Sequence, residues 1–105
     1  MVEVFFVTGR KKSDPKIDGK TPTEWTYENL AKAGYLGLSP DRLRMSSANW
    51  NGHPSVADFK TDARKSIESK FNVTIIANVG DQNSDLDGGY AERTFKVPNP
   101  FYFIP

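Results

Sequence analysis

The sequence predicts an α/β fold with a mostly parallel sheet, and three observations support this class. Runs rich in β-branched and aromatic residues, typical of strands, occur at residues 2–7 and 73–79. Two other segments begin with helix-capping signals. Strand-like and helix-like segments alternate along the chain, which favours right-handed βαβ crossovers. We therefore expect a single domain over residues 1–105, with a modest core.

The first predicted strand covers residues 2–7, whose sequence is V-E-V-F-F-V. Thr8, Gly9 and Arg10 are expected to end it. Residues 11–20 are basic, contain Asp, Pro and Gly, and have almost no apolar content. That composition is typical of an exposed loop.

The first helix is predicted to begin after Thr21. Threonine is a good capping residue, Pro22 suits the first helical position, and Glu24 completes a capping-box pattern. Gly34 is a natural stop. The residues that fall near one face of this helix are Trp25, Asn29, Leu30 and Ala33.

A short strand is predicted at residues 42–46, followed by a loop at residues 47–54 that holds Trp50 and His53. Ser55 and Asp58 repeat the capping-box spacing, so a second helix is expected from there to about Lys70. Its buried stripe would consist of Phe59, Ala63 and Ile67.

The strongest strand prediction is for residues 73–79, an apolar run expected to be buried. Gly88 and Gly89 mark a turn, and residues 93–97 form a last short strand. Two prolines then force an extended tail through residues 98–103.

Composition argues against several classes of protein. The net charge is +1 and the basic residues are scattered, which disfavours nucleic-acid binding. No cysteine is present, and the single histidine, His53, excludes a multi-histidine metal site. No apolar run has the length of a membrane span. Residues 1–7 lack the basic start and small-residue cleavage site of a signal peptide, so none is expected in this chain.

The candidate site begins with Asp81 and Asp85, which follow the strand predicted at residues 73–79. In open α/β sheets, ligands bind outside the carboxyl ends of strands. Two carboxylates there suit Mg²⁺, which also takes waters and phosphate oxygens. The alternative is a polar turn in which Asp and Asn bind backbone groups.

Three further residues are expected at the same sheet edge. Thr8 offers a hydroxyl, Gly9 lets an anion approach the backbone, and Lys60 offers an ammonium group to a phosphate. Hydroxyl, ammonium and metal-binding carboxylates together form an environment for phosphoryl transfer.

Each of these residues also has a simpler interpretation. Thr-Gly-Arg is a common strand ending, a helix lysine such as Lys60 is usually solvated, and we assign Arg10 a structural role. His53 has no identifiable acidic partner and is assigned to the loop. The aromatic tail is expected to pack on the domain, with lining of a substrate cleft as the alternative.

Four motifs occur in order along the chain: V-F-F-V-T-G-R, F-K-T-D-A-R, V-G-D-Q-N-S-D-L and R-T-F-K-V-P-N-P-F-Y-F-I-P. Together they resemble the subfamily IIIB acid phosphatases of the haloacid dehalogenase (HAD) superfamily. This branch contains plant acid phosphatases, vegetative storage proteins and bacterial relatives. The first helix also resembles the T-x-x-N-L-x-x-A-G-Y stretch of that branch. The resemblance covers nearly the whole chain and implies a partial HAD-like Rossmannoid three-layer fold.

The resemblance implies a role for each candidate residue. Thr8 matches the second-motif hydroxyl that binds the transferring phosphoryl group, together with Gly9. Lys60 matches the third-motif lysine that orients the nucleophile and balances charge. Asp81 matches the fourth-motif Mg²⁺ ligand, and Asp85 a supporting or second ligand. Arg64, one turn beyond Lys60, is expected to be structural.

The first motif of the family, D-x-D-x-T/V, supplies its nucleophile and its general acid/base. The only matching triplet here, Asp85-Leu86-Asp87, belongs to the fourth motif. The first-motif strand is central in the family's sheet. Without it, residues 2–7 must pair directly with residues 73–79 or leave open edges, and open edges favour self-association.

Two functions follow from these expectations. The first is an acid phosphatase-like domain that binds a phosphomonoester or inorganic phosphate and Mg²⁺, inactive alone for want of its nucleophile. The alternative is a non-catalytic storage-type or partner-dependent protein that binds phosphate or metal. Neither a nucleic-acid nor a membrane partner is expected.

Overall fold

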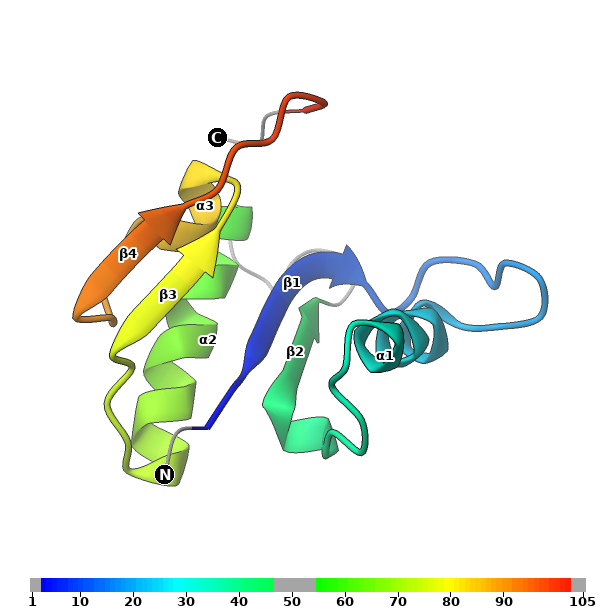
Figure 1. Ribbon diagram of the computed structural model, residues 1–105, viewed down its shortest axis with the longest axis horizontal. Coiled ribbons are helices and arrows are strands. Elements are labelled where there is room, and N and C mark those ends of the chain that lie inside the picture. The colour runs from blue at the N-terminus through cyan, green and yellow to red at the C-terminus, as the bar shows by residue number, and fades with distance from the viewer. Residues whose placement is uncertain (1–2, 47–54, 103–105) are drawn as a thin grey trace. The chain divides into compact units, whose positions relative to one another are not determined.

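The computed structural model describes residues 3–46 and 55–102. The chain divides into two compact units, residues 1–52 and residues 53–105, and each is described by itself. Each unit is mixed α/β and contains a two-stranded parallel sheet (Figure 1). The predicted α/β class with parallel strands is therefore confirmed. The loop predicted at residues 47–54 lies outside the described residues.

In the first unit, β1 (Phe6–Lys11) pairs in parallel with β2 (Leu43–Ser46), which follows the short helix η1 (Pro40–Arg42). The predicted bounds of the first strand, residues 2–7, are wrong. Residues 3–5 are not in the strand, and β1 continues past Val7 to Lys11. The reason is that Lys11 pairs with Ser46, so the reach of the partner strand sets the bounds.

Helix α1 (Pro22–Lys32) begins as predicted, with a complete capping box. Thr21 Oγ1 accepts a hydrogen bond from the backbone of Glu24, and Glu24 accepts one from the backbone of Thr21, both at 3.2 Å. The expected face is wrong in part, because Asn29 and Ala33 are exposed and the buried residue is Thr26. Thr26 binds Arg10 of β1, and this contact turns its side of the helix inward.

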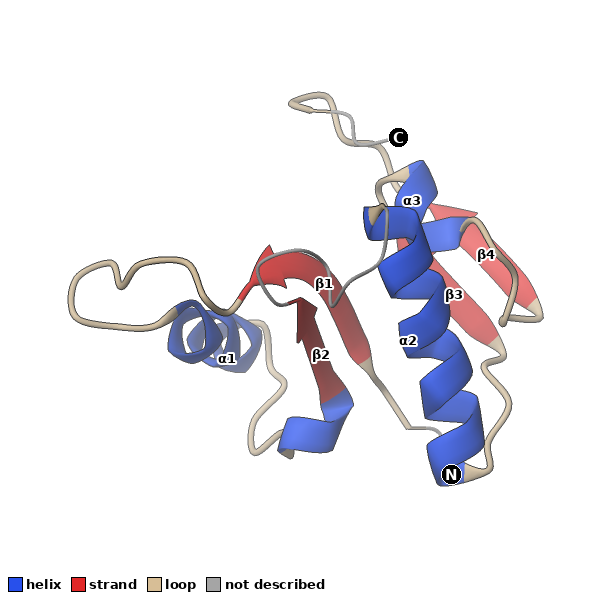
Figure 2. Ribbon diagram, turned by 180° about the vertical axis from the view of Figure 1, so that it is seen from behind, coloured by secondary structure: helices blue, strands red, loops and turns tan. Residues whose placement is uncertain are grey.

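The second unit contains α2 (Val56–Phe71), β3 (Ala77–Gly80), the one-turn helix α3 (Asn83–Leu86) and β4 (Arg93–Lys96). Helix α2 lies along one face of β3 and β4 (Figures 1 and 2). Ser55 caps it as predicted, because its Oγ accepts from Asp58 N at 3.2 Å. The predicted stripe is confirmed, since Phe59, Ala63 and Ile67 are 4%, 8% and 1% exposed.

The strand predicted at residues 73–79 is shorter than expected and is not buried. The observed β3 begins at Ala77, and Ile76 and Val79 are 56% and 66% exposed. Its partner β4, predicted at residues 93–97, is exposed along its length. The physical reason is that α2 covers one face only, which leaves Val79 and its register partner Phe95 on an uncovered face. The sequence pattern indicated that these residues are apolar, but it could not indicate that one face of the sheet has no helix packed on it.

The two sheets remain separate in the part of the chain that the structure describes. Strand β1 pairs with β2, and β3 with β4, so each strand has one hydrogen-bonded neighbour in these sheets. Direct pairing of the first strand with residues 73–79 and open strand edges are the two expected alternatives, and because these strands lie in different units the choice between them stays a prediction. Gly88 and Gly89 form the predicted turn with φ of +97° and +78°. No helix among the described residues has the length and apolar character needed to cross a membrane.

Candidate functional site

The acidic segment (residues 80–87) joins β3 to α3 and carries both predicted metal ligands. Asp85 lies in α3, where its carboxylate pairs with the ammonium group of Lys60 and accepts from Gln82 N at 3.0 Å. The side chains of Lys60 and Asp85 are only 8% and 16% exposed. The interpretation of Lys60 as a solvated helix lysine is therefore wrong. A buried ammonium group requires a nearby carboxylate, and Asp85 supplies it.

Gly80 allows this segment to fold tightly. A Cβ atom on Gly80 would lie 2.3 Å from the Cβ of Asp85, closer than real Cβ atoms approach one another. The glycine is needed here because the backbone of β3 passes directly against the Asp85 side chain. The close approach brings Asp85 back towards α2, where Lys60 lies.

Arg64 fixes the far end of the acidic segment. Its guanidinium donates to the backbone oxygens of Asp85 at 2.8 Å and Gly89 at 3.1 Å, and also to that of Asp87. Arg64 is 4% exposed, and burial lowers its pKa. The predicted structural role of Arg64 is confirmed, because it holds three carbonyl groups that would otherwise lack these donors.

Asp81 stands apart from this ion pair and is held by the tail (residues 97–102). Asn99 Nδ2 donates to Asp81 Oδ2, and Gln82 Nε2 lies 3.5 Å from the same oxygen. The hydrogen bond from Asn99 is the main cause that lowers the pKa of Asp81. Asp81 is therefore an ionised carboxylate at the end of β3.

Of the two predicted metal ligands in the acidic segment, Asp81 can offer a divalent cation one carboxylate. Among the described residues, no group of three or more His, Cys, Asp or Glu side chains is placed to hold a metal. Mg²⁺ is usually bound through one or two carboxylates with waters and phosphate oxygens, so Asp81 suits a single-carboxylate contribution. Asp85 already has Lys60 and Gln82 as partners, and its role as a second ligand stays a prediction.

The hydroxyl segment (residues 8–10) lies in the first unit, within β1. Thr8 pairs with Met45 and Lys11 with Ser46, so Gly9 and Arg10 form a bulge without register partners. Bulges are frequent beside functional sites because they redirect the chain. Here the bulge takes the place of the expected strand end, and Thr8 Oγ1 accepts from Arg10 N at 3.2 Å.

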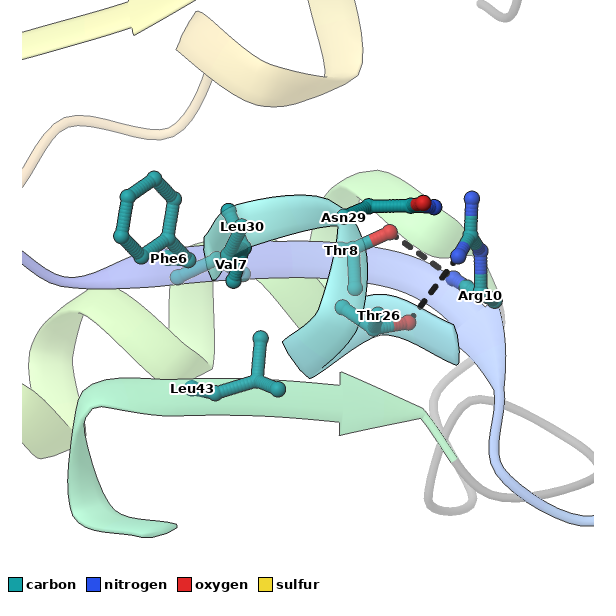
Figure 3. Close-up of a pocket in the computed structure, with 8 residues that line it drawn as sticks. All are labelled: Phe6, Val7, Thr8, Arg10, Thr26, Asn29, Leu30 and Leu43. Atoms are coloured by element: carbon teal, nitrogen blue, oxygen red, sulfur yellow. Dashed lines mark hydrogen bonds between the residues drawn. The ribbon is translucent and has the colours of Figure 1, made fainter. Parts of the chain in front are cut away.

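A cavity of about 210 Å³ opens beside this bulge. Figure 3 shows polar groups at one end of it and apolar side chains at the other. Arg10 Nη1 donates to Thr26 Oγ1 at 3.0 Å, and Thr26 Oγ1 donates to Pro22 O at 2.7 Å. The eight lining residues are Phe6, Val7, Thr8, Arg10, Thr26, Asn29, Leu30 and Leu43. The structural role predicted for Arg10 agrees with these contacts, which fasten α1 to the bulge.

The structure thus brings Lys60 and Asp85 together. Asp81 lies in the same acidic segment of the second unit but is held by Asn99. Thr8 and Gly9 belong to the first unit, so their meeting with Lys60 stays a prediction. Sequence reasoning missed Asn99, Gln82 and Thr26. A usable signal existed for Asn99, because an asparagine between two prolines is well suited to bind nearby backbone groups.

Comparison with known proteins adds one clear family match. The family model described as HAD superfamily, subfamily IIIB (Acid phosphatase), matches residues 2–105. No solved structure gives a significant match.

Three curated plant proteins illustrate the similarity. Stem 28 kDa glycoprotein from Glycine max is 37% identical over 105 residues, which is 97% of this chain and 37% of that protein. Acid phosphatase 1 from Solanum lycopersicum is 33% identical over 103 residues, covering 97% and 36%. Vegetative storage protein 2 from Arabidopsis thaliana is 43% identical over 80 residues, covering 76% and 28%. The chain therefore spans about a third of the length of these relatives.

Proposed function

The chain belongs to the subfamily IIIB acid phosphatases of the HAD superfamily, and from this premise we propose that it binds phosphate and Mg²⁺ and has little or no turnover alone. The proposed ligand is inorganic phosphate or a small phosphomonoester. The observation that carries the proposal is the buried ion pair between Lys60 and Asp85, in the same acidic segment as Asp81. A buried ion pair often contributes no more stability than apolar residues of the same volume, which supports a role for this pair other than stability.

Each side chain has a defined part in this proposal. Asp81 contributes a carboxylate to the cation. Asp85 has a supporting part, because it holds the ammonium group of Lys60 in place. The bound cation would neutralise negative charge on the phosphate oxygens. Lys60 adds a point charge next to the same group, while Thr8 and Gly9 bind phosphate oxygens through a hydroxyl and backbone N–H groups.

Low turnover follows from the absence of a suitable nucleophile. The family reaction proceeds by attack of an aspartate on phosphorus, and water then hydrolyses the aspartyl-phosphate. The sole Asp-x-Asp triplet begins at Asp85, whose carboxylate is engaged by Lys60 and Gln82. Removing the nucleophile from a covalent mechanism costs many orders of magnitude in rate.

Two measurements on the full chain test the proposal. Calorimetry with Mg²⁺ and inorganic phosphate should detect weak binding that Asp81→Ala abolishes. An assay with p-nitrophenyl phosphate and Mg²⁺ at acidic pH should show no turnover above background. Turnover that survives purification and disappears in Asp81→Ala would contradict the claim of low activity. Absence of both phosphate and cation binding would contradict the binding claim.

The second candidate is a storage-type or partner-dependent protein without catalysis. Its support is that relatives named vegetative storage proteins match the same region of this chain. Binding of phosphate without any cation dependence would favour this candidate.

We also propose self-association through exposed strand edges. Its support is the pair of two-stranded sheets, together with Val79 and Phe95, which are 66% and 50% exposed. Light scattering after size exclusion should show a mass that rises with concentration. A monomer at every concentration would contradict it.

A further inference from the structure

The tail contains an asparagine whose side chain binds in two directions at once. Asn99 Oδ1 accepts from the backbone N–H groups of Phe101 at 2.9 Å and Tyr102 at 3.3 Å. Its Nδ2 donates to Asp81 Oδ2. The oxygen faces donors and the nitrogen faces a carboxylate, so every contact matches the chemistry of the amide. Asn99 therefore joins a local turn in the tail to the carboxylate at the end of β3.

A second amide, that of Gln82 in the acidic segment, also joins this segment to the tail. Gln82 is 2% exposed, and its Nε2 donates to Tyr102 O at 3.1 Å. The same nitrogen lies 3.5 Å from Asp81 Oδ2. Both amide groups therefore meet at one oxygen of Asp81, and both also bind the tail backbone. Two donors on one oxygen restrict rotation of the carboxylate, which a single flexible contact would not do.

Two prolines prepare the tail for this arrangement. Pro98 and Pro100 fix their own φ angles and restrict the residues before them to extended conformations. Asn99 lies between them, so the backbone that carries it loses less conformational freedom on folding. The P-N-P sequence thus favours a tail that arrives at Asp81 already ordered.

We propose that Asn99 and Gln82 are positioning residues for Asp81: they latch the tail to the acidic segment and hold the carboxylate in the orientation that binds a divalent cation. This inference rests on the proposed function, because it assigns a cation to Asp81. It gives the tail a task other than the expected packing on the domain, which is wrong for Phe101 and Tyr102 because they are 91% and 58% exposed. Outer partners that orient a ligating carboxylate commonly change metal affinity by 10–100-fold.

Mn²⁺ is used as the probe of cation binding, because the concentration of free Mn²⁺ is measured directly from its electron paramagnetic resonance signal. In the full chain, Asn99→Ala should weaken Mn²⁺ binding about tenfold, the lower end of that range, since Asp81 is partly exposed to solvent. The amide NMR signals of Phe101 and Tyr102 should shift in Asn99→Ala, which removes their acceptor, and less in Asp81→Ala, which opens the latch but keeps the Asn99 turn. Circular dichroism checks that the fold is retained.

A second variant separates the turn from the latch. Asn99→Ser keeps an oxygen that can accept from Phe101 N but is too short to reach Asp81. It should retain part of the tail signals and still lose Mn²⁺ affinity as Asn99→Ala does. The matched control is Asn83→Ala, which removes an exposed amide of the same size from α3 and should change neither reading.

The outcomes distinguish this inference from the function on which it rests. If the unaltered chain binds Mn²⁺ through Asp81 and Asn99→Ala binds it equally well, the positioning role is overturned and the proposed function stands. If the unaltered chain binds no Mn²⁺, the cation part of the proposed function fails, and the positioning role fails with it. Weaker binding together with shifted tail signals supports the inference.

Discussion

The acidic segment and the hydroxyl segment match two motifs of one family, but they are held in different ways. The acidic segment is fixed by buried cations from α2, since Lys60 binds Asp85 and Arg64 binds three carbonyl groups. The hydroxyl segment has a bulge beside an open cavity, where the principal side-chain contact is that of Arg10 with Thr26. The first arrangement is closed and charge-compensated, and the second is open on one side.

This difference shows which part of the candidate site is organised within one compact unit. Lys60 and Arg64 lie more than 20 residues away from the acidic-segment residues that they bind, but in the same compact unit. Buried charges tolerate few alternative positions because an unpaired one is strongly unfavourable. The acidic segment is therefore expected to keep its geometry, whereas the principal side-chain contact of the hydroxyl segment, that of Arg10 with Thr26, does not pair two charges. Four predictions test this contrast.

The largest effect is expected from Arg64→Met. Methionine keeps much of the apolar volume but leaves three backbone oxygens without the guanidinium. Loss of these bonds should lower the free energy of unfolding by about 3 kcal/mol, since a hydrogen bond to a charged group contributes about 1.5–3 kcal/mol and two of the three oxygens keep side-chain donors, from Asn78 and Thr61. Urea denaturation followed by circular dichroism measures it. Lys65→Met, an exposed neighbour on α2, is the control. Equal stability of the two variants would show that the hydrogen bonds of Arg64 to the three carbonyl groups do not stabilise the fold.

The next effect is expected from breaking the buried ion pair. Lys60→Met leaves the Asp85 carboxylate uncompensated and should cost about 2 kcal/mol, less than a fully buried pair because Asp85 is partly solvated. Asp85→Asn in the same chain removes that charge while still accepting from Gln82 N. The double variant should therefore be more stable than Lys60→Met alone, as urea denaturation will report. A double variant that is less stable would mean that charge compensation is not what Lys60 provides.

The sequence predicted the local parts of this molecule well and the long-range parts poorly. The caps at Thr21 and Ser55 depend on neighbours three residues away, so their hydrogen bonds follow from spacing alone. The buried face of α2 likewise follows from helical periodicity. The exposure of Val79 does not, because it depends on which elements cover the sheet.

The candidate site divides along the same line. The expected topology placed Lys60 at the same sheet edge as the acidic segment, but it did not predict the ion pair with Asp85, because residue type and spacing do not show which carboxylate an ammonium group will meet. The contact between Asn99 and Asp81 joins residues 18 positions apart, and only the folded path of the tail brings them together. Thr26 was missed because a buried threonine on a helix has no periodic signature.

A smaller effect is expected from Thr26→Val in the first unit. Valine keeps the shape of threonine but cannot accept from Arg10 Nη1, so about 1 kcal/mol of stability should be lost. Arg10 should then point into the cavity with greater freedom, which amide NMR of Gly9 and Arg10 will detect. Thr23→Val, a partly exposed position on α1, is the control. A loss as large as that of Arg64→Met would remove the contrast between the two segments.

The smallest effect is expected from lowering the pH, which tests the contact between the acidic segment and the tail. The hydrogen bond from Asn99 lowers the pKa of Asp81, so the ionised carboxylate favours the folded tail. A lowered pKa contributes stability that is present above the unfolded value of about 3.9 and is lost as the pH falls through the folded value. The amide signals of Phe101 and Tyr102 should therefore stay constant from neutral pH to below the unfolded pKa of about 3.9. At still lower pH they should change before the amide signals of α2 do. Release of the tail in mildly acidic solution would mean that Asp81 does not hold it as an anion. In Asn99→Ala the tail signals should already be those of the released state at neutral pH, because the donor itself is gone.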